Sequence, residues 1–107
     1  TIKFRAWLGG VIHPVWERID YGVYKTHPDI IIMQFTDLLD MDGKEIYEGD
    51  IVQEYLRFPG GMEQRIGTEI VKFEYTGWEP FNNYEWGMCP KDCKVVGNIY
   101  ENPELVK

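Results

Sequence analysis

Short runs of β-branched and aromatic residues, interrupted by turn-forming residues about every ten positions, limit most strongly what this chain can form. Such runs cover residues 2–8, 30–35, 51–58 and 94–100, and Gly, Pro, Asn or Asp separates them. No long stretch shows the spacing of apolar residues that marks an amphipathic helix. The pattern therefore predicts a mainly β fold, arranged as a small barrel or sandwich.

The chain length suits one domain with its own hydrophobic core, at 107 residues and 12.6 kDa. We predict a single domain over residues 1–107, with N-terminal strands over about 1–45 and an SH3-like barrel over about 46–101. A compact α+β fold is the alternative, if residues 36–45 are helical.

Several local signals predict individual elements. Gly9-Gly10 predicts a hairpin turn, and Pro14 belongs at a strand edge or bulge because it cannot donate to a ladder. Residues 30–35 are almost continuously apolar, which predicts a strand buried on both faces. Residues 64–75 predict one long strand. Residues 102–104 (Asn-Pro-Glu) predict a cap followed by a helix or a single 3₁₀ turn.

The segment "LLDMDGKEIYEGDIV", residues 38–52, concentrates carboxylates and raises three hypotheses: a calcium loop, a catalytic acid cluster or a charged turn. With Gly43 placed at the sixth position of an EF-hand loop, Asp40 and Asp42 occupy the third and fifth positions. Leu38 and Gly49 then occupy the first and twelfth positions, where calcium needs carboxylates. This mismatch argues against calcium.

Catalytic carboxylates usually require burial to shift their pKa values, whereas this polar, glycine-containing segment predicts exposure to solvent. Lys44 is the only other candidate for acid–base chemistry in it. We therefore expect a charged connection, with no catalytic residue and no cofactor. Asp42-Gly43 and residues 48–50 (Glu-Gly-Asp) predict two tight turns, and Asp50 is expected to bond to backbone groups of its own turn.

The two cysteines, Cys89 and Cys93, lie in "CPKDC". A zinc site would need two further ligands, and the only histidines, His13 and His27, lie far away in the sequence. We therefore expect no metal site and two reduced thiols. Both histidines are expected to be surface or edge residues, because no nucleophile motif accompanies either.

The net charge is −7, and half of the 18 acidic residues lie within residues 29–64, which hold only two Lys or Arg residues. An acidic surface repels phosphate, so duplex DNA is a poor ligand. No apolar run is long enough to cross a bilayer and no export signal opens the chain, so we expect a cytoplasmic protein with no membrane contact.

Two surfaces are candidates for binding. The aromatic side chains of "GWEPFNNYEWG" could form a peptide groove or stack single-stranded bases, although strand pairing and core packing also explain them. The acidic belt of residues 37–54 could bind a basic partner, although solubility and protection of a strand edge also explain it. The candidate residues are Trp78, Phe81, Tyr84 and Trp86 in the first surface, and Asp40, Asp42, Glu45 and Glu48 in the second.

Three stretches resemble one known family: "KFRAW" near the start, "IIMQFTDLLDMDGKEIYEGDIV" in the middle and "DCKVVGNIYENPELV" at the end. Together they resemble the YopX-like family of small phage and prophage proteins. The resemblance implies a β-rich protein of phage or prophage origin in a bacterial host. It implies no enzymatic reaction, so it assigns no catalytic residues.

We therefore expect a non-enzymatic protein–protein interaction module, whose partner is an unknown host or phage protein. A single-stranded nucleic-acid-binding barrel is the main alternative, and a hydrolase using the central carboxylates is a weaker one. Exposed barrel edges would also allow the chain to form a homo-oligomer.

Overall fold

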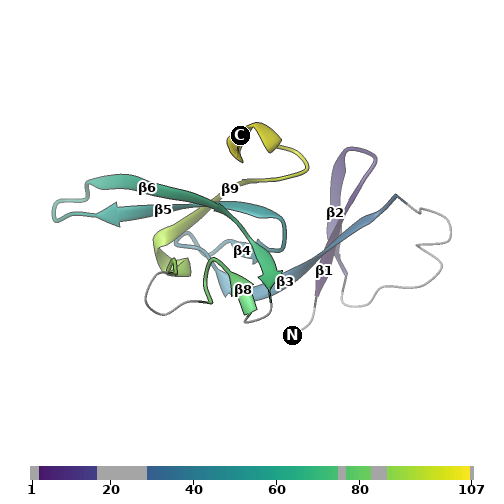
Figure 1. The fold of residues 1–107 in the computed structure, drawn as a ribbon, viewed down its shortest axis with the longest axis horizontal. Coiled ribbons are helices and arrows are strands. Elements are labelled where there is room, and N and C mark those ends of the chain that lie inside the picture. The colour runs from purple at the N-terminus through teal and green to yellow at the C-terminus, as the bar shows by residue number, and fades with distance from the viewer. Residues whose placement is uncertain (1–2, 17–28, 75–76, 83–86, 107) are drawn as a thin grey trace.

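A computed structural model describes residues 3–16, 29–74, 77–82 and 87–106 of the chain. These residues form β-strands and two short 3₁₀ turns, with no α-helix among them, so the predicted mainly β class is confirmed (Figure 1). The elements in chain order are β1 (Phe4–Leu8), β2 (Val11–Trp16), β3 (Ile31–Leu39), β4 (Glu45–Tyr47), β5 (Asp50–Arg57), β6 (Glu63–Ile70), β7 (Lys72–Glu74), β8 (Gly77–Glu79), η1 (Pro90–Asp92), β9 (Cys93–Asn98) and η2 (Pro103–Val106).

The strands form three antiparallel sheets, with orders β2-β1-β3-β4, β6-β5-β9 and β7-β8. The long strand β3 serves two neighbours, since its first half pairs with β1 and its second half with β4. Figure 1 shows the β1–β2 hairpin at one end of the molecule and the β5–β6 hairpin reaching toward the other.

Backbone hydrogen bonds outside the ladders curl the sheets into a half-barrel. The Met41 N–H donates to the Cys93 carbonyl at 2.9 Å, which joins the end of β3 to the start of β9. The Val71 N–H donates to the Asp50 carbonyl at 2.9 Å, and the Gly49 N–H donates to the Val71 carbonyl at 2.8 Å. These bonds hold the junction of β6 and β7 against the start of β5.

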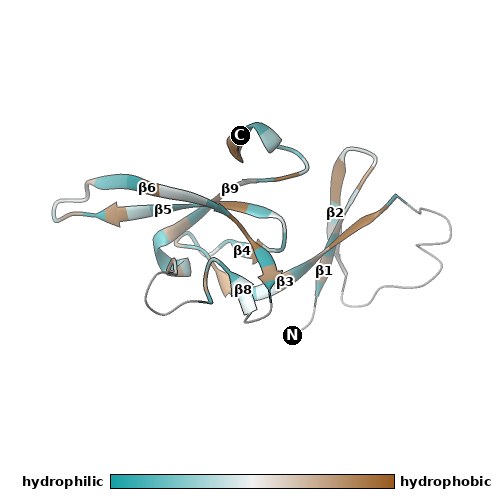
Figure 2. Cartoon of the chain, viewed as in Figure 1, coloured by the Kyte–Doolittle hydropathy of each residue, from teal (hydrophilic) through white to brown (hydrophobic). Residues whose placement is uncertain are grey.

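Two clusters of buried side chains form the core, and apolar colouring follows β3 and β9 in Figure 2. The first lies under the β5 sheet, and the second lies between β3, β4 and the N-terminal hairpin. The buried members are Ile46, Val52, Val71 and Cys93 in the first cluster, and Met33, Phe35 and Tyr47 in the second.

The predictions made from Gly9-Gly10, Pro14 and residues 102–104 are confirmed. Leu8 pairs with Val11 around the Gly9-Gly10 turn, and Pro14 lies in β2, which is an outer strand of its sheet. A register shift also occurs in this pair of strands, beside Phe4. The 3₁₀ turn η2 begins at Pro103, as the Asn-Pro-Glu sequence predicts.

Three predictions of local structure are wrong. Residues 36–45 form no helix, because β3 continues to Leu39 and a turn leads into β4. Residues 30–35 are not buried on both faces, because Gln34 is exposed between buried Met33 and Phe35. Residues 64–75 are not one strand, because Val71 bonds to the chain at Gly49 and Asp50 and separates β6 from β7.

The same break changes the faces of this segment. Val71 has no exposed surface, whereas Phe73 is 62% exposed, so the two do not share the face that strict alternation predicts. The sequence also predicts turns at His27-Pro28-Asp29, Thr76-Gly77 and Asn82-Asn83, and each of these turns includes residues that lie outside the described ranges.

Candidate functional site

The acidic segment after β3 begins with a turn built on the Asp40 side chain. Asp40 Oδ1 accepts hydrogen bonds from the backbone N–H groups of Asp42, at 2.8 Å, and Lys44, at 2.9 Å. Gly43 has a φ of +80°, which glycine adopts without steric strain. The predicted Asp42-Gly43 turn is confirmed, and the carboxylate of Asp40 holds it together.

Asp40 also connects two distant strands. Its Oδ2 accepts a hydrogen bond from the backbone N–H of Val95 in β9, at 3.0 Å and 55 positions away in the sequence. Asp40 is buried, with 6% of its surface exposed. One carboxylate therefore closes a turn and fastens the edge of the β5 sheet, which is a structural role.

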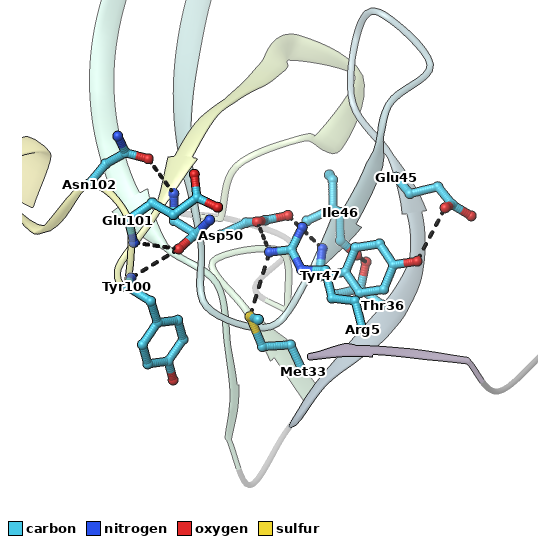
Figure 3. Close-up of polar contacts among 11 residues, drawn as sticks. Arg5, Met33, Thr36, Glu45, Ile46, Tyr47, Asp50, Tyr100, Glu101 and Asn102 are labelled. Carbon is cyan, nitrogen blue, oxygen red and sulfur yellow. Dashed lines mark hydrogen bonds and ion pairs between the residues drawn. The ribbon is translucent and has the colours of Figure 1, made fainter. Parts of the chain in front are cut away.

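The second turn, before β5, places Asp50 in the interior. Gly49 has a φ of +86°, and the Tyr47 N–H donates to Asp50 Oδ2 at 2.7 Å. The Arg5 guanidinium from β1 pairs with Asp50 Oδ1 and lies 4.5 Å from the centroid of the Tyr47 ring (Figure 3). The predicted bond from Asp50 to its own turn is confirmed, and the ion pair links the N-terminal sheet to it.

Burial controls the protonation of three groups in this region. Removal from water raises the pKa of Asp50, and the Arg5 guanidinium opposes this rise. Burial raises the pKa of Tyr47 to about 12, with a further contribution from the Glu45 carboxylate. Burial also raises the pKa of Cys93 to about 12, so this thiol stays protonated at neutral pH.

The expectation that the central carboxylates face solvent is wrong for Asp40 and Asp50, because both are buried and bonded to backbone N–H groups. Asp42 is exposed as expected. Glu45 is half-buried, pairs with Lys3 and accepts a hydrogen bond from the Tyr47 hydroxyl at 3.2 Å. Glu48 is also half-buried. These four candidate residues of the acidic belt (Asp40, Asp42, Glu45 and Glu48) therefore do not form one exposed surface.

The described part of the aromatic candidate surface packs inward. Trp78 and Phe81 are half-buried and pack against the first core cluster, and Trp78 meets the Phe73 ring edge-on with centroids 5.0 Å apart. Tyr84 and Trp86 lie outside the described residues. Core packing thus accounts for the two aromatic residues that can be placed.

The other described candidates for chemistry are one histidine and two cysteines, and none of them belongs to a group of metal-ligand side chains. His13 is half-buried on β2, with its Nε2 at 3.2 Å from the Leu8 carbonyl oxygen, and His27 lies outside the described residues. Cys89 is exposed, Cys93 is buried, and both are free thiols. Within the described ranges, no three His, Cys, Asp or Glu side chains gather as metal ligands would, and no helix is long and apolar enough to cross a membrane.

A groove of about 740 Å³ lies between the β3–β4 connection and η1. Its walls are mainly apolar, and the lining includes two exposed charged residues of opposite sign, Asp37 and Lys91. Asp37 has a φ of +68°, at a register shift between β3 and β4. We call this feature the groove; its lining residues are Asp37, Leu38, Leu39, Asp40, Met41, Gly43, Cys89, Pro90 and Lys91.

Large apolar side chains are also exposed on the β5–β6 hairpin, a surface that the sequence reasoning missed. Leu56 is 46% exposed, Phe58 43%, Met62 71% and Ile66 52%. The Phe58 N–H donates to the Met62 carbonyl at 2.7 Å, which closes the loop between the strands. A period-two pattern alone could not locate this patch, because the strand also carries polar residues on both faces.

Comparisons with known proteins identify a family and a similar solved structure. A family profile described as "YopX protein" matches residues 13–107. The crystal structure of protein EF1440 from Enterococcus faecalis is similar, with a TM-score of 0.67 at 22% identity, over 100% of this chain and 99% of that one. No curated protein matches the sequence. The profile match spans nearly all of the sequence, and the chain belongs to the YopX family.

Proposed function

We propose that this protein is a non-enzymatic module of phage or prophage origin that binds another protein in the bacterial cytoplasm. The contact site in this proposal is the groove, and its occupant is a segment of a partner that carries large apolar side chains next to Arg or Lys. Such a segment would place its apolar side chains between the walls and its cation beside Asp37.

The observation that carries this proposal is the combination of apolar walls with an exposed carboxylate, Asp37, in the lining. Leu39, 48% exposed, and the neighbouring Leu38 and Met41 line one wall, and Pro90 lies on the other. The volume of about 740 Å³ falls within the range typical of ligand pockets. A groove of this kind gains affinity from buried apolar side chains and orientation from charge.

The hydrogen bonds of the two buried carboxylates, Asp40 and Asp50, indicate a structural role for both. This role supports the proposal of a non-enzymatic protein. Both Asp40 oxygens accept backbone N–H groups, and both Asp50 oxygens have partners. Asp50, the described carboxylate whose pKa burial raises, lines neither the groove nor the 420 Å³ cavity beside β6 and η2. A hydrolase that used Asp50 as its general acid would need this carboxylate to face a cavity that a substrate can enter.

Single-stranded nucleic acid is the competing ligand. Base stacking requires exposed aromatic faces, and Trp78 and Phe81 instead pack on the core. The net charge of −7 further opposes contact with a phosphate backbone. These observations favour protein over nucleic acid as the partner.

Affinity capture from a bacterial lysate with matched variants tests the proposal. Leu39→Asp places a charge in the groove, whereas Phe73→Ser changes an exposed apolar residue outside it. We expect wild type and Phe73→Ser to retain the same protein and Leu39→Asp to lose it. Equal capture by all three would contradict the proposed site, and tight, salt-sensitive binding of a single-stranded oligonucleotide would favour the competing function.

A further inference from the structure

The chemistry that suits the groove is present in this same chain. The β5–β6 hairpin carries exposed Leu56, Phe58, Met62 and Ile66, and exposed Arg65 lies among them. We propose that the groove of one copy receives the β5–β6 hairpin of a second copy, and the reverse, so that the protein forms a two-fold dimer. This inference rests on the proposed function, because it names the occupant of the same groove.

The hairpin cannot fill the groove of its own chain. β5 and β6 pair along their full lengths, and the Arg57 guanidinium fixes the end of β5 to η1 through the Lys91 carbonyl. The tip therefore projects past η1, which forms one wall of the groove (Figure 1). Figure 2 shows apolar colour where β5 ends, at this projecting tip. A second copy is the nearest source of a matching surface.

The two surfaces match in size and in charge. A volume of about 740 Å³ accommodates several large side chains, such as those of Phe58 and Met62. Arg65 on the hairpin is opposite in charge to Asp37 in the groove, and Glu63 on the hairpin is opposite in charge to Lys91 in the groove. Opposite charges around an apolar centre are the usual arrangement of a specific interface.

The placement of hairpin and groove allows a closed assembly. Figure 1 shows the hairpin tip and the turn η1 in the same half of the long axis, so two copies related by a two-fold axis can exchange hairpins. Each contact then occurs twice, and the assembly ends at two chains.

Solution mass, measured from low to several hundred micromolar, tests the dimer. We expect wild type to dimerise as concentration rises, and Met62→Asp in the hairpin and Leu39→Asp in the groove each to shift the equilibrium at least tenfold toward monomer. Val11→Asp is the matched control, because Val11 is 55% exposed on β2, away from both surfaces. Mixing the two monomeric variants should restore a weaker dimer, since one intact hairpin then meets one intact groove.

Cross-linking places the contact directly. Cys89 is exposed and lines the groove, so on addition of a thiol oxidant, which takes up the two electrons, Met62→Cys is expected to form a disulfide with Cys89 of a second copy, seen as a dimer on a non-reducing gel. Val11→Cys should give no such dimer. This experiment does not depend on a destabilising charge.

The outcomes separate the two proposals. A monomer at every concentration, or a dimer that neither Met62→Asp nor Leu39→Asp weakens, would overturn the second-copy inference. If that monomer still captured a bacterial protein through Leu39, the proposed function would stand. If it captured none, both proposals would fail.

Discussion

Asp40 offers the sharpest test of how this fold is held together. Its carboxylate accepts three backbone N–H groups, two in its own turn and one from Val95 in β9. Asp40→Ala leaves all three without this acceptor. Asp40→Asn keeps one carbonyl oxygen, which can serve the turn, but turns an amide toward the N–H of Val95.

The magnitudes follow from burial. The N–H groups of Asp42 and Lys44 belong to exposed residues and can bond to water, so each lost bond costs about 1 kcal/mol. In Asp40→Ala, the N–H of half-buried Val95 loses its acceptor, Asp40 Oδ2, and this loss costs about 2 kcal/mol. We therefore expect Asp40→Ala to destabilise by about 4 kcal/mol and Asp40→Asn by about 2 kcal/mol. Asp42→Ala, in the same turn but exposed, should change stability by about 0.5 kcal/mol or less.

Urea unfolding measures these differences in the free energy of unfolding. An m-value equal to that of wild type would show that unfolding exposes the same surface area. Asp40→Ala should also lower the melting temperature by about 15 °C, at roughly 4 °C per kcal/mol for a domain of this size. Hydrogen exchange at the Val95 amide should accelerate in both Asp40 variants and remain slow in Asp42→Ala. The reasoning fails if Asp40→Asn unfolds like Asp42→Ala, or if exchange at Val95 does not change.

Three further outcomes are expected. Burial raises the pKa of Asp50 above its unfolded value, so its titration contributes stability below the unfolded pKa that is lost as pH rises through the folded pKa. Unfolding free energies against pH should therefore show wild type losing stability relative to Asp50→Asn across that window; a relative gain would mean that the pairing with arginine outweighs burial. Gly49→Ala should destabilise by about 2 kcal/mol and Gly43→Ala by about 1 kcal/mol in thermal melts, because both have positive φ but a Cβ at Gly49 meets a tyrosine ring at 3.2 Å and one at Gly43 meets nothing. A neutral-pH thiol titration should label the exposed cysteine at once and Cys93, whose pKa burial raises to about 12, only after unfolding; prompt labelling of both would contradict its burial.

Sequence reasoning succeeded where neighbouring residues determine the structure. The Asp42-Gly43 turn and the turn at Gly49-Asp50 depend on glycine and on short side chains that bond to nearby backbone groups. The family resemblance rests in part on the segment that contains these two turns, and the profile match confirms the family. Local chemistry thus predicted the turns and the mainly β class together.

Burial of the carboxylates could not be predicted, because their partners lie far along the chain. Val95 is 55 positions from Asp40, and Arg5 is 45 positions from Asp50. A run of acids and glycine usually indicates an exposed loop, and nothing local distinguishes a carboxylate that faces water from one that faces a strand edge. The groove has the same origin, since Met41 and Pro90 meet only in the folded chain.

The break at Val71 shows a second limit. Period-two alternation assumes that a strand continues in one direction, and residues 64–75 satisfy that pattern. The backbone of Val71 instead bonds to Gly49 and Asp50, so the chain bends and Phe73 turns outward. A competing hydrogen-bond partner thus overrode a correct local pattern.

The reach of the β5–β6 hairpin has a consequence for how such a protein changes over time. Leu56, Phe58, Met62 and Ile66 belong to neither core cluster, so their exchange leaves the folding free energy almost unaffected. Substitutions at these four positions therefore change the surface of the hairpin and leave the two core clusters unchanged. In the proposed dimer, a lineage of such chains would change its binding partner through substitutions in the β5–β6 hairpin, while the hydrophobic core stays the same.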